Sequence, residues 1–320
     1  MAGSDSNRER ELSEDIIQKA LQIGFHSVGI SQATRSPHAD RFLNWVEKKR
    51  FATMEWITRN PERRTDPRNS LPGAQSILTV SLPYSSAQSP QESASEAPVK
   101  FARYAKGRDY HRVMKPLLRE LCESVSDGGT WNTWWSVDTS PILERDWAEL
   151  SGIGWIGKNG LVIDQEIGSW FFLGAIVTDR PYRPTAPAVD HCGNCTRCID
   201  ACPTDAIVSP RTIDAGRCIS YWTIEHRGNL PVDSKLHDWA FGCDICQEVC
   251  PWNTRPARIE PKIHPELAPR KFPSDPQEVA NMSKQEWLDT FAGTPVTRAG
   301  YEGLKRNAQK IIEERNEIRK

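Results

Sequence analysis

The 320-residue chain lacks three features that would each define a broad class of protein. Its longest apolar run, Trp170 to Val177, is far shorter than the ~20 residues of a membrane-spanning helix. The polar, charged stretch from Met1 to Glu11 contains no apolar segment of the kind a secretory signal needs. The 41 Lys and Arg nearly balance the 42 Asp and Glu, which excludes nucleic-acid binding through overall basicity but leaves local patches open. We therefore expect a cytoplasmic protein with no membrane segment.

Three cofactor motifs are absent, incomplete or out of context. There is no C-x3-C-x2-C triplet, which argues against radical S-adenosylmethionine chemistry. Asp109-Tyr110-His111 opens like the D-x-H-x-x-G cobalamin box, but Met114 stands at the glycine position. Residues 152–157 match G-x-G-x-x-G, yet a helix is predicted before them and a strand after them. Because nucleotide binding requires the reverse order, we interpret these glycines as a tight turn.

Cysteine is concentrated in one part of the chain. Eight of the nine cysteines fall within 59 positions. In a chain of this length without an export signal, such clustering indicates metal ligands rather than disulfides. The ninth, Cys122, lies alone in a predicted helix and is expected to be an ordinary buried core residue.

Two related cysteine runs predict two [4Fe–4S] clusters. The first, Cys192-x2-Cys195-x2-Cys198-x3-Cys202-Pro203, has the spacing of bacterial ferredoxins, in which the fourth cysteine ligates the other cluster and is expected to begin a helix. The second run has the same ending but lacks one cysteine, which Cys218 can replace. The predicted ligand sets are Cys192, Cys195, Cys198 and Cys250 for one cluster, and Cys202, Cys218, Cys243 and Cys246 for the other. The alternative is a pair of four-cysteine zinc sites, for which a reciprocal run of this kind is much less typical.

Hydrophobic patterning predicts a mixed fold, α+β or α/β. Alternating helices and strands cover 1–185, a proline-rich linker follows, and the C-terminal part combines loops and helices. The expected domains are 1–185, 186–256 and 257–320, and 85–98 is expected to be a low-complexity loop. The predicted helices are 13–23, 40–59, 111–125, 143–151, 283–291 and 298–317, and the predicted strands are 26–30, 74–82, 131–137 and 170–177.

Two basic segments with interleaved aromatic residues are candidates for nucleic-acid contact. Residues 48–68 carry a net charge of +4, and residues 98–115 carry +5. Trp56, Tyr104 and Tyr110 lie among these charges, a combination that suits unstacked bases. The alternative is a solvated charged surface.

Five sequence blocks resemble the epoxyqueuosine reductase family. The match extends from about residue 10 to the Arg298–Ala308 segment, after which the chain ends at Lys320. Many family members continue into a C-terminal helical-repeat domain, so a short form is expected. The blocks are Arg103 to His111, Val137 to Arg145, Gly154 to Asn159, Arg217 to Glu225 and Phe241 to Asn253.

The resemblance implies an enzyme that reduces epoxyqueuosine to queuosine at the wobble position of tRNA. It implies cobalamin and two [4Fe–4S] clusters as cofactors, and an external low-potential electron donor. The α/β part would be similar to the corrinoid-binding domain of reductive dehalogenases, with a ferredoxin-like module packed on it, and we expect a monomer. The competing interpretations are another corrinoid and iron–sulfur reductase with a small-molecule substrate, an electron-transfer subunit, and a zinc-stabilised RNA-binding module.

The same resemblance assigns roles to individual residues. Asp138 would donate the proton that the leaving epoxide oxygen needs and would also lie against the cofactor; on spacing alone it could equally be a turn residue. The other expected contacts to cobalamin are Arg64, Arg103, Tyr104, Lys158, Asn159 and Ser220, with Lys106 and Arg108 as further candidates for anionic groups of cobalamin or tRNA.

Overall fold

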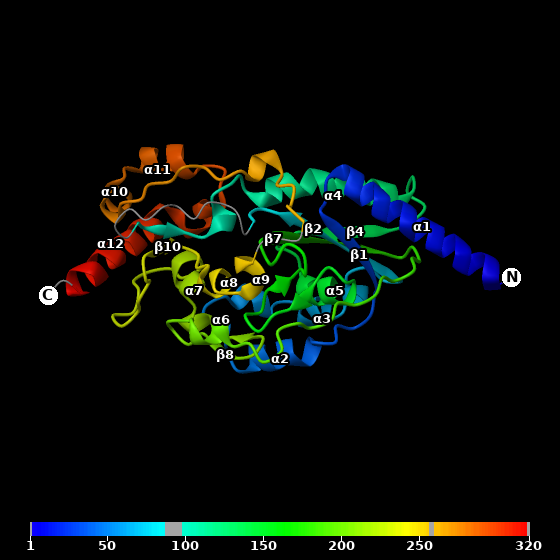
Figure 1. Cartoon of the computed structure of the whole chain (residues 1–320), viewed down its shortest axis with the longest axis horizontal. Coiled ribbons are helices and arrows are strands. Elements are labelled where there is room, and N and C mark those ends of the chain that lie inside the picture. Colours follow the sequence, from blue (N-terminus) through cyan, green and yellow to red (C-terminus); the bar gives the residue numbers. More distant parts are fainter. Residues whose placement is uncertain (1, 87–97, 256–258, 319–320) are drawn as a thin grey trace.

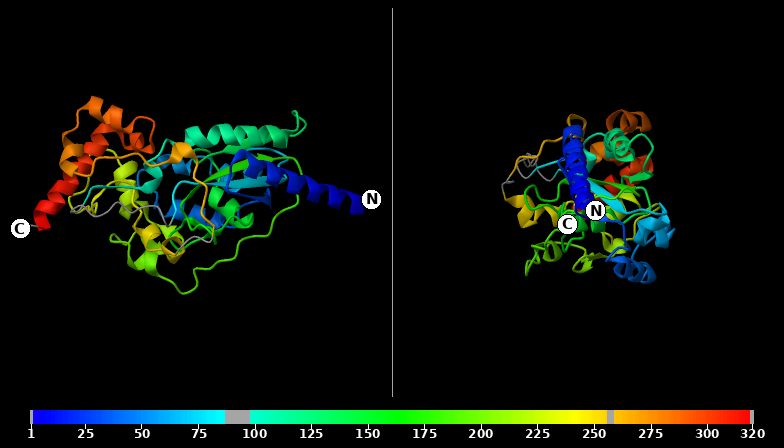
Figure 2. Two further views of the ribbon diagram at one scale, coloured as in Figure 1. Left: turned by 45° about the horizontal axis from the view of Figure 1, so that its top comes forward. Right: turned by 90° about the vertical axis from the view of Figure 1, so that its right-hand side faces the viewer.

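The computed structural model describes residues 2–86, 98–255 and 259–318. Most of the loop predicted for 85–98 therefore lies outside the described residues. Within them, no helix combines the length and apolar character that crossing a membrane requires. Helices α1 (Ala2–Ile23) and α12 (Gly300–Ile318) lie at opposite ends of the long axis of the molecule (Figure 1, Figure 2).

A four-stranded antiparallel sheet forms the centre of the larger half. Its strand order is β1-β2-β7-β4, and every neighbouring pair is antiparallel. Antiparallel pairing needs no crossover helices, so this part of the mixed fold is α+β. The four predicted strands are confirmed to within a few residues at β1 (Ser27–Gln32), β2 (Ser76–Pro83), β4 (Thr133–Ser136) and β7 (Phe171–Thr178).

Helices cover both faces of this sheet (Figure 1). Leu78 on β2 points into the core shared with α1 and α4 (Tyr110–Ser126). Its neighbour Ile77 points to the other face and packs with Trp147 of α5 (Glu144–Leu150). Successive strand residues alternate between faces, so a strand covered on both sides must be apolar throughout. All eight positions of β2 are buried.

The prediction of a helix over 40–59 is wrong in its second half. Helix α2 (Ala39–Glu47) is followed by turns and then by a short 3-10 helix, Glu55–Thr58. Lys49 and Ala52 have φ angles of 50° and 55°. A right-handed helix cannot contain residues in this left-handed region, so the chain must turn here.

The cysteine-rich segment consists of short elements packed below β7 in Figure 1. Helix α9 (Pro251–Thr254) begins directly after Cys250, with Pro251 in its first turn. The helix expected to begin at Cys202 is absent, because the chain there turns instead into the β8–β9 hairpin. The other elements of this segment are α6 (Arg197–Asp200), β8 (Ile207–Ser209), β9 (Thr212–Ile213), α7 (Ile219–Ile224) and α8 (Ile245–Glu248). Outside it, the larger half also contains the short elements α3 (Pro61–Thr65), β5 (Trp155–Ile156) and β6 (Val162–Ile163).

The C-terminal helices form a second hydrophobic core with the end of the cysteine-rich segment. The predicted helices are confirmed at α11 (Lys284–Phe291) and α12, with α10 (Pro276–Asn281) before them. Strand β10 (Trp239–Phe241) pairs in parallel with β3 (Lys100–Phe101) beneath these helices. The fully buried Asn307 of α12 donates to the carbonyl oxygens of Thr223 (3.0 Å) and Ala240 (2.8 Å), which fixes α12 to both α7 and β10.

Candidate functional site

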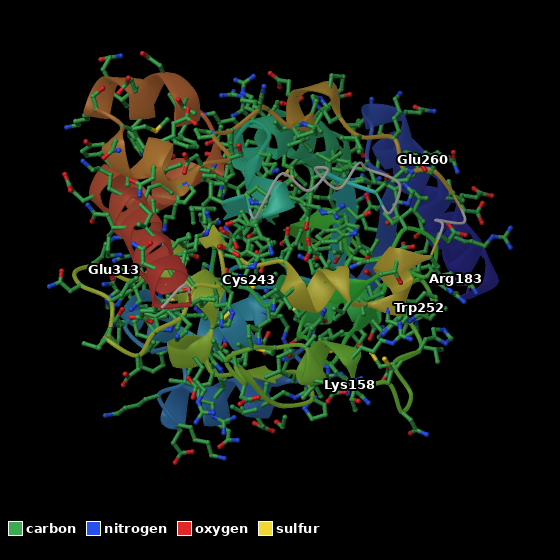
Figure 3. The ribbon with its side chains drawn as sticks, turned by 60° about the vertical axis from the view of Figure 1, so that its left-hand side comes forward. Lys158, Arg183, Cys243, Trp252, Glu260 and Glu313 are labelled. Atoms are coloured by element: carbon green, nitrogen blue, oxygen red, sulfur yellow. The ribbon has the colours of Figure 1, made fainter. Side chains whose placement is uncertain are left out.

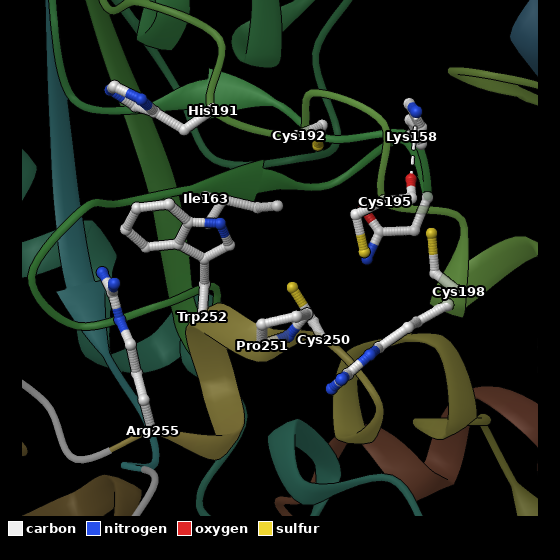
Figure 4. A pocket seen from close by; sticks show the side chains of 12 residues that line it. Lys158, Ile163, His191, Cys192, Cys195, Cys198, Cys250, Pro251, Trp252 and Arg255 are labelled. Carbon is white, nitrogen blue, oxygen red and sulfur yellow. Dashed lines mark hydrogen bonds between the residues drawn. The ribbon is translucent and has the colours of Figure 1, made fainter.

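Four cysteines line a cavity of about 240 Å³ (Figure 4). Cys192, Cys195 and Cys198 come from the first run, and Cys250 comes from the second. Burial raises the pKa of the Cys198 thiol to about 11, and the nearby Cys250 and Cys192 thiols act in the same direction. The structure thus brings together the four residues predicted for one cluster, and we call this space the first cysteine cavity.

The other four cysteines of the two runs form a second group. Burial raises the pKa of the Cys243 thiol, and the neighbouring Cys218 and Cys202 thiols raise it further. Burial also raises the pKa of the Cys246 thiol, and the neighbouring Cys243 and Cys218 thiols raise it further. Cys246 also interacts with Cys198, so the two groups adjoin. In Figure 3, Cys243 of the second group lies to the left of Lys158 and Trp252, which line the first cysteine cavity. Cys122 lies apart from both groups in the sheet core, as predicted.

The arrangement of the thiols suits clusters better than single ions. Among the described residues, no three or more His, Cys, Asp or Glu side chains are placed to hold one metal ion. Four thiolates around one zinc ion would lie only about 4 Å apart, because each Zn–S bond is about 2.3 Å long. A [4Fe–4S] core is larger and holds its thiolates farther apart. Two sets of four cysteines therefore fit two [4Fe–4S] clusters.

The two groups differ in their contact with solvent. Cys195 in the first group is exposed, whereas all four cysteines of the second group are half-buried. The Trp155 indole N–H donates to the sulfur of Cys192 at 3.4 Å. The Lys158 ammonium donates to the carbonyl oxygens of Gly193 (2.7 Å) and Cys195 (3.0 Å) and so holds the loop that carries these cysteines.

A polar site surrounds Asp138 in the loop after β4. Asp138 has a φ angle of 58°, and about two thirds of its side chain is exposed. The Tyr110 hydroxyl donates to Asp138 Oδ2 at 2.8 Å. His111 Nε2 lies 3.8 Å from the same oxygen, is buried and has no hydrogen-bond partner among the described residues, while His111 Nδ1 lies 2.9 Å from Asp109 Oδ1. Two neighbouring side chains at the start of α4 therefore converge on one carboxylate.

A buried carboxyl group lies behind Asp138. Burial and, to a lesser extent, the charge of Asp138 together raise the pKa of Glu144 to about 8. The Ser136 hydroxyl donates to Glu144 Oε1 at 3.0 Å. Burial lowers the pKa of the Arg64 guanidinium, while the nearby Glu144 and Asp138 carboxylates oppose this change. Glu144 is thus mainly protonated at neutral pH, and its neutral form limits the negative charge around Asp138.

Tyr104 connects the Asp138 site to the second cysteine group. Burial raises its pKa, and Asp138 and then Asp244 contribute in the same direction. Asp244 lies between two cysteines of the second group and accepts the Arg103 backbone N–H at 2.7 Å. A Cβ atom at Gly242, whose φ angle is 70°, would lie only 2.4 Å from the Cβ atom of Ala102. Glycine is therefore required for this close approach.

The residues expected to contact cobalamin occupy three places. Arg103 and Tyr104 lie between the second cysteine group and Asp138, where the Arg103 guanidinium stacks 4.6 Å from the Trp170 ring centre. Arg64 lies beside Glu144. The other three lie next to cysteines. Lys158 and Asn159 line the first cysteine cavity, and Asn159 also donates to the Cys246 carbonyl oxygen at 3.4 Å. Ser220 lies in the first turn of α7, two residues after Cys218.

Sequence reasoning missed Tyr110, His111 and Glu144 as members of the Asp138 site. In the sequence, Tyr110 and His111 belong to an incomplete cobalamin box, and Tyr110 is also one of the aromatic residues of a basic segment. Their position next to Asp109, which caps α4 by accepting the His111 backbone N–H at 3.0 Å, is a recognisable helix start. Nothing in the spacing indicates that this helix start faces the loop after β4.

An α+β scaffold that presents two adjoining sets of four cysteines beside an exposed carboxylate defines an iron–sulfur oxidoreductase. Residues 191–253 match the family model described as a 4Fe-4S double cluster binding domain. Residues 64–139 match the model described as Epoxyqueuosine reductase QueG, DUF1730.

Full-length relatives identify the family. An epoxyqueuosine reductase of Cellulophaga algicola is 36% identical over 315 residues, covering 94% of this chain and 98% of the relative. The epoxyqueuosine reductase of Atelocyanobacterium thalassa is 38% identical over 307 residues, covering 93% of this chain and 98% of the relative. The chain belongs to the epoxyqueuosine reductase family.

Solved structures of this family share the fold. A crystal structure of epoxyqueuosine reductase with an epoxyqueuosine-modified tRNA-Tyr stem loop matches with a TM-score of 0.84 and 31% identity, covering 94% of this chain and 81% of the other. A structure of the Bacillus subtilis enzyme, with its catalytic aspartate loop swung out of the active site, matches with a TM-score of 0.82, 29% identity and the same coverage.

Proposed function

We propose that this protein reduces epoxyqueuosine in tRNA to queuosine, with Asp138 as the proton donor. The observation that carries the proposal is that Tyr104 connects the second cysteine group to the Asp138 site. A relative with a TM-score of 0.84 is described in complex with an epoxyqueuosine-modified tRNA stem loop, which supports RNA as the substrate. We assign residues 1–185 to cofactor and substrate binding, 186–256 to the clusters and 257–320 to support of that core.

Asp138 is placed to act on a substrate that arrives from solvent. Removal of an epoxide oxygen as water takes up two electrons and two protons, and the opening oxygen needs an acid beside it. The exposed Asp138 carboxyl would supply that proton from Oδ1 or Oδ2. The Tyr110 hydroxyl, which donates to Oδ2, would hold the carboxyl in one orientation.

The residues present fit the cofactors that the family implies. Two sets of four thiols fit two [4Fe–4S] clusters, which when bound supply one-electron transfer. Near Asp138, the buried His111 Nε2 lacks a hydrogen-bond partner among the described residues, and Tyr104, Tyr110 and Phe172 form an aromatic wall. Such a wall suits a large, partly apolar ligand such as cobalamin, which when bound supplies a strongly reducing centre. Arg103, Tyr104 and Asp138 would hold it, with Arg64, Lys158, Asn159 and Ser220 as further candidates.

The test is anaerobic incubation of the protein with epoxyqueuosine-containing tRNA, cobalamin and dithionite, followed by nucleoside mass spectrometry. We expect queuosine from the wild-type protein and a loss of about 100-fold or more for Asp138→Asn, the lower end of the range for a general acid. Asp127→Asn is the matched control, because Asp127 has a φ angle of 50° and a side chain that is 65% exposed. Normal turnover by Asp138→Asn protein with full iron content would remove Asp138 from the mechanism, and no queuosine from the wild type would remove the function.

A further inference from the structure

We propose that the surface around the first cysteine cavity is the docking site of a small acidic protein that carries one electron. The proposal rests on the proposed function, because epoxide reduction consumes electrons that the chain itself does not supply. At this surface, one electron would leave the reduced carrier and enter the oxidised cluster, and no covalent bond would form or break.

Exposure of a thiol identifies this surface as the entry point. Of the nine cysteines, all within the described residues, Cys195 alone is exposed. The four thiols of the second group, those of Cys202, Cys218, Cys243 and Cys246, are all half-buried. The second group also adjoins Tyr104, which packs in one hydrophobic cluster with Cys243. The first group adjoins the second where Asn159, which lines the first cysteine cavity, donates to the Cys246 carbonyl oxygen at 3.4 Å. A carrier protein can therefore approach the first group most closely.

The charge around the cavity determines the chemistry of the partner. Lys158, Arg197 and Arg255 line it, and none of the other described residues that line it is an Asp or a Glu. The neighbouring Asp190 is already paired with Arg211. Arg197 is exposed at the start of α6, two residues after Cys195. Such a ring of cations attracts an acidic partner and accelerates its association.

Aromatic rings give the same surface a rigid, partly apolar centre. The Trp252 ring lies 4.8 Å from that of Trp155 and 5.7 Å from that of the exposed His191. The Arg255 guanidinium stacks 3.6 Å from the Trp252 ring centre. Figure 4 shows Trp252, His191 and Arg255 side by side at one end of the cavity. Aromatic and arginine side chains at a central position are typical of protein interfaces.

A second cavity provides a comparison within the same chain. This space of about 460 Å³ is bordered by Arg217, Lys235 and His237, but also by Asp233, and no cysteine lines it. It lacks both the exposed thiol and the uniform charge of the first cysteine cavity. Arg217 is exposed like Arg197 and lies next to Cys218, so it offers a matched position for a control substitution.

The experiment measures binding of oxidised flavodoxin, as an acidic carrier, to the anaerobic cluster-loaded protein by calorimetry at low and high salt. We expect Arg197→Glu to weaken binding by roughly 10-fold or more at low salt, the lower end of the range for electrostatic steering. Arg217→Glu should change the affinity for flavodoxin by less than about twofold, because Arg217 is an exposed charge outside the proposed interface. Added salt should weaken wild-type binding and shrink the difference between the variants. As a second measurement, bleaching of cluster absorbance by reduced flavodoxin should slow only in Arg197→Glu, while bleaching by dithionite should not change.

Three outcomes would overturn the proposal. Equal binding by wild-type and Arg197→Glu protein would remove Arg197 from the interface, and a larger effect of Arg217→Glu would move the interface to the second cavity. Loss of tRNA affinity in Arg197→Glu with unchanged flavodoxin binding would assign the surface to RNA. Dithionite-driven queuosine formation is scored separately and needs no carrier, so its failure would contradict the proposed function and leave the docking result interpretable.

Discussion

Replacing Glu144 by Gln should stabilise the protein, and increasingly so as the pH rises. Burial raises the pKa of Glu144 from 4.5 to about 8. Between these two values the unfolded chain releases a proton that the folded chain keeps, so the free energy of unfolding falls as the pH rises. The fall is about 1.4 kcal/mol per pH unit, which gives about 3 kcal/mol at pH 7 and about 5 kcal/mol above pH 8. Glutamine cannot ionise and retains an oxygen for the Ser136 hydroxyl, so it avoids this loss.

The assay is anaerobic urea unfolding of the cluster-loaded protein at pH 5, 6, 7 and 8, followed by tryptophan fluorescence. The stability difference between Glu144→Gln and wild type should grow with each step and level off above pH 8. Glu149 on the same helix is the matched control: burial acts to raise its pKa, but hydrogen bonds from His38 and the Ile156 backbone N–H outweigh burial and lower it. Glu149→Gln should therefore destabilise the protein at pH 7. Parallel pH profiles for Glu144→Gln and wild type would refute the argument.

Three further substitutions test separate contacts. Tyr110→Phe removes the donor to Asp138 and should slow queuosine formation about 10-fold at unchanged iron content, as expected for one hydrogen bond to an exposed charged group. Trp155→Phe removes the N–H donor to Cys192 and should lower the reduction potential of the more exposed cluster in an electron paramagnetic resonance titration. Asn307→Ala leaves the buried Thr223 and Ala240 carbonyl groups without their side-chain donor and should cost about 2–4 kcal/mol in urea unfolding.

Elements with strong local signals were predictable from the sequence. The apolar run that forms β7 and the amphipathic pattern of α4 lie within a few residues of their predicted bounds. The ferredoxin-like spacing also predicted which cysteines come together, because each run places its first cysteines in one turn and its last one beyond it. Their ligation of clusters stays a prediction. The helix over 40–59 failed since nothing in its composition reveals the left-handed residues Lys49 and Ala52.

The Asp138 site could not be derived in this way, because it depends on tertiary contacts. Tyr110 and Asp138 are 28 positions apart, on a helix and on a loop that meet only when α4 packs against the sheet. Arg64 approaches the same place from a third segment. Burial of Glu144 follows from the same packing, and the shift of its pKa cannot be read from its neighbours in sequence. Family resemblance supplied Asp138 and gave Arg64 as a candidate cobalamin contact, but it assigned no role to Tyr110 or Glu144.

The positions of the two sites would allow one small scaffold to serve both a large RNA substrate and the proposed protein electron donor. An epoxide carried by a tRNA must be reached from solvent, and the side chain of Asp138, the proposed proton donor, is about two thirds exposed. An exposed carboxyl group is preorganised only if neighbouring groups fix its position and its electrostatic environment. The Tyr110 hydroxyl donates a hydrogen bond to Asp138, and the neutral Glu144 limits the negative charge nearby. The first cysteine cavity reaches solvent at Cys195, and the half-buried second group lies next to Tyr104, which packs with Cys243. Electrons and RNA therefore need not compete for one surface.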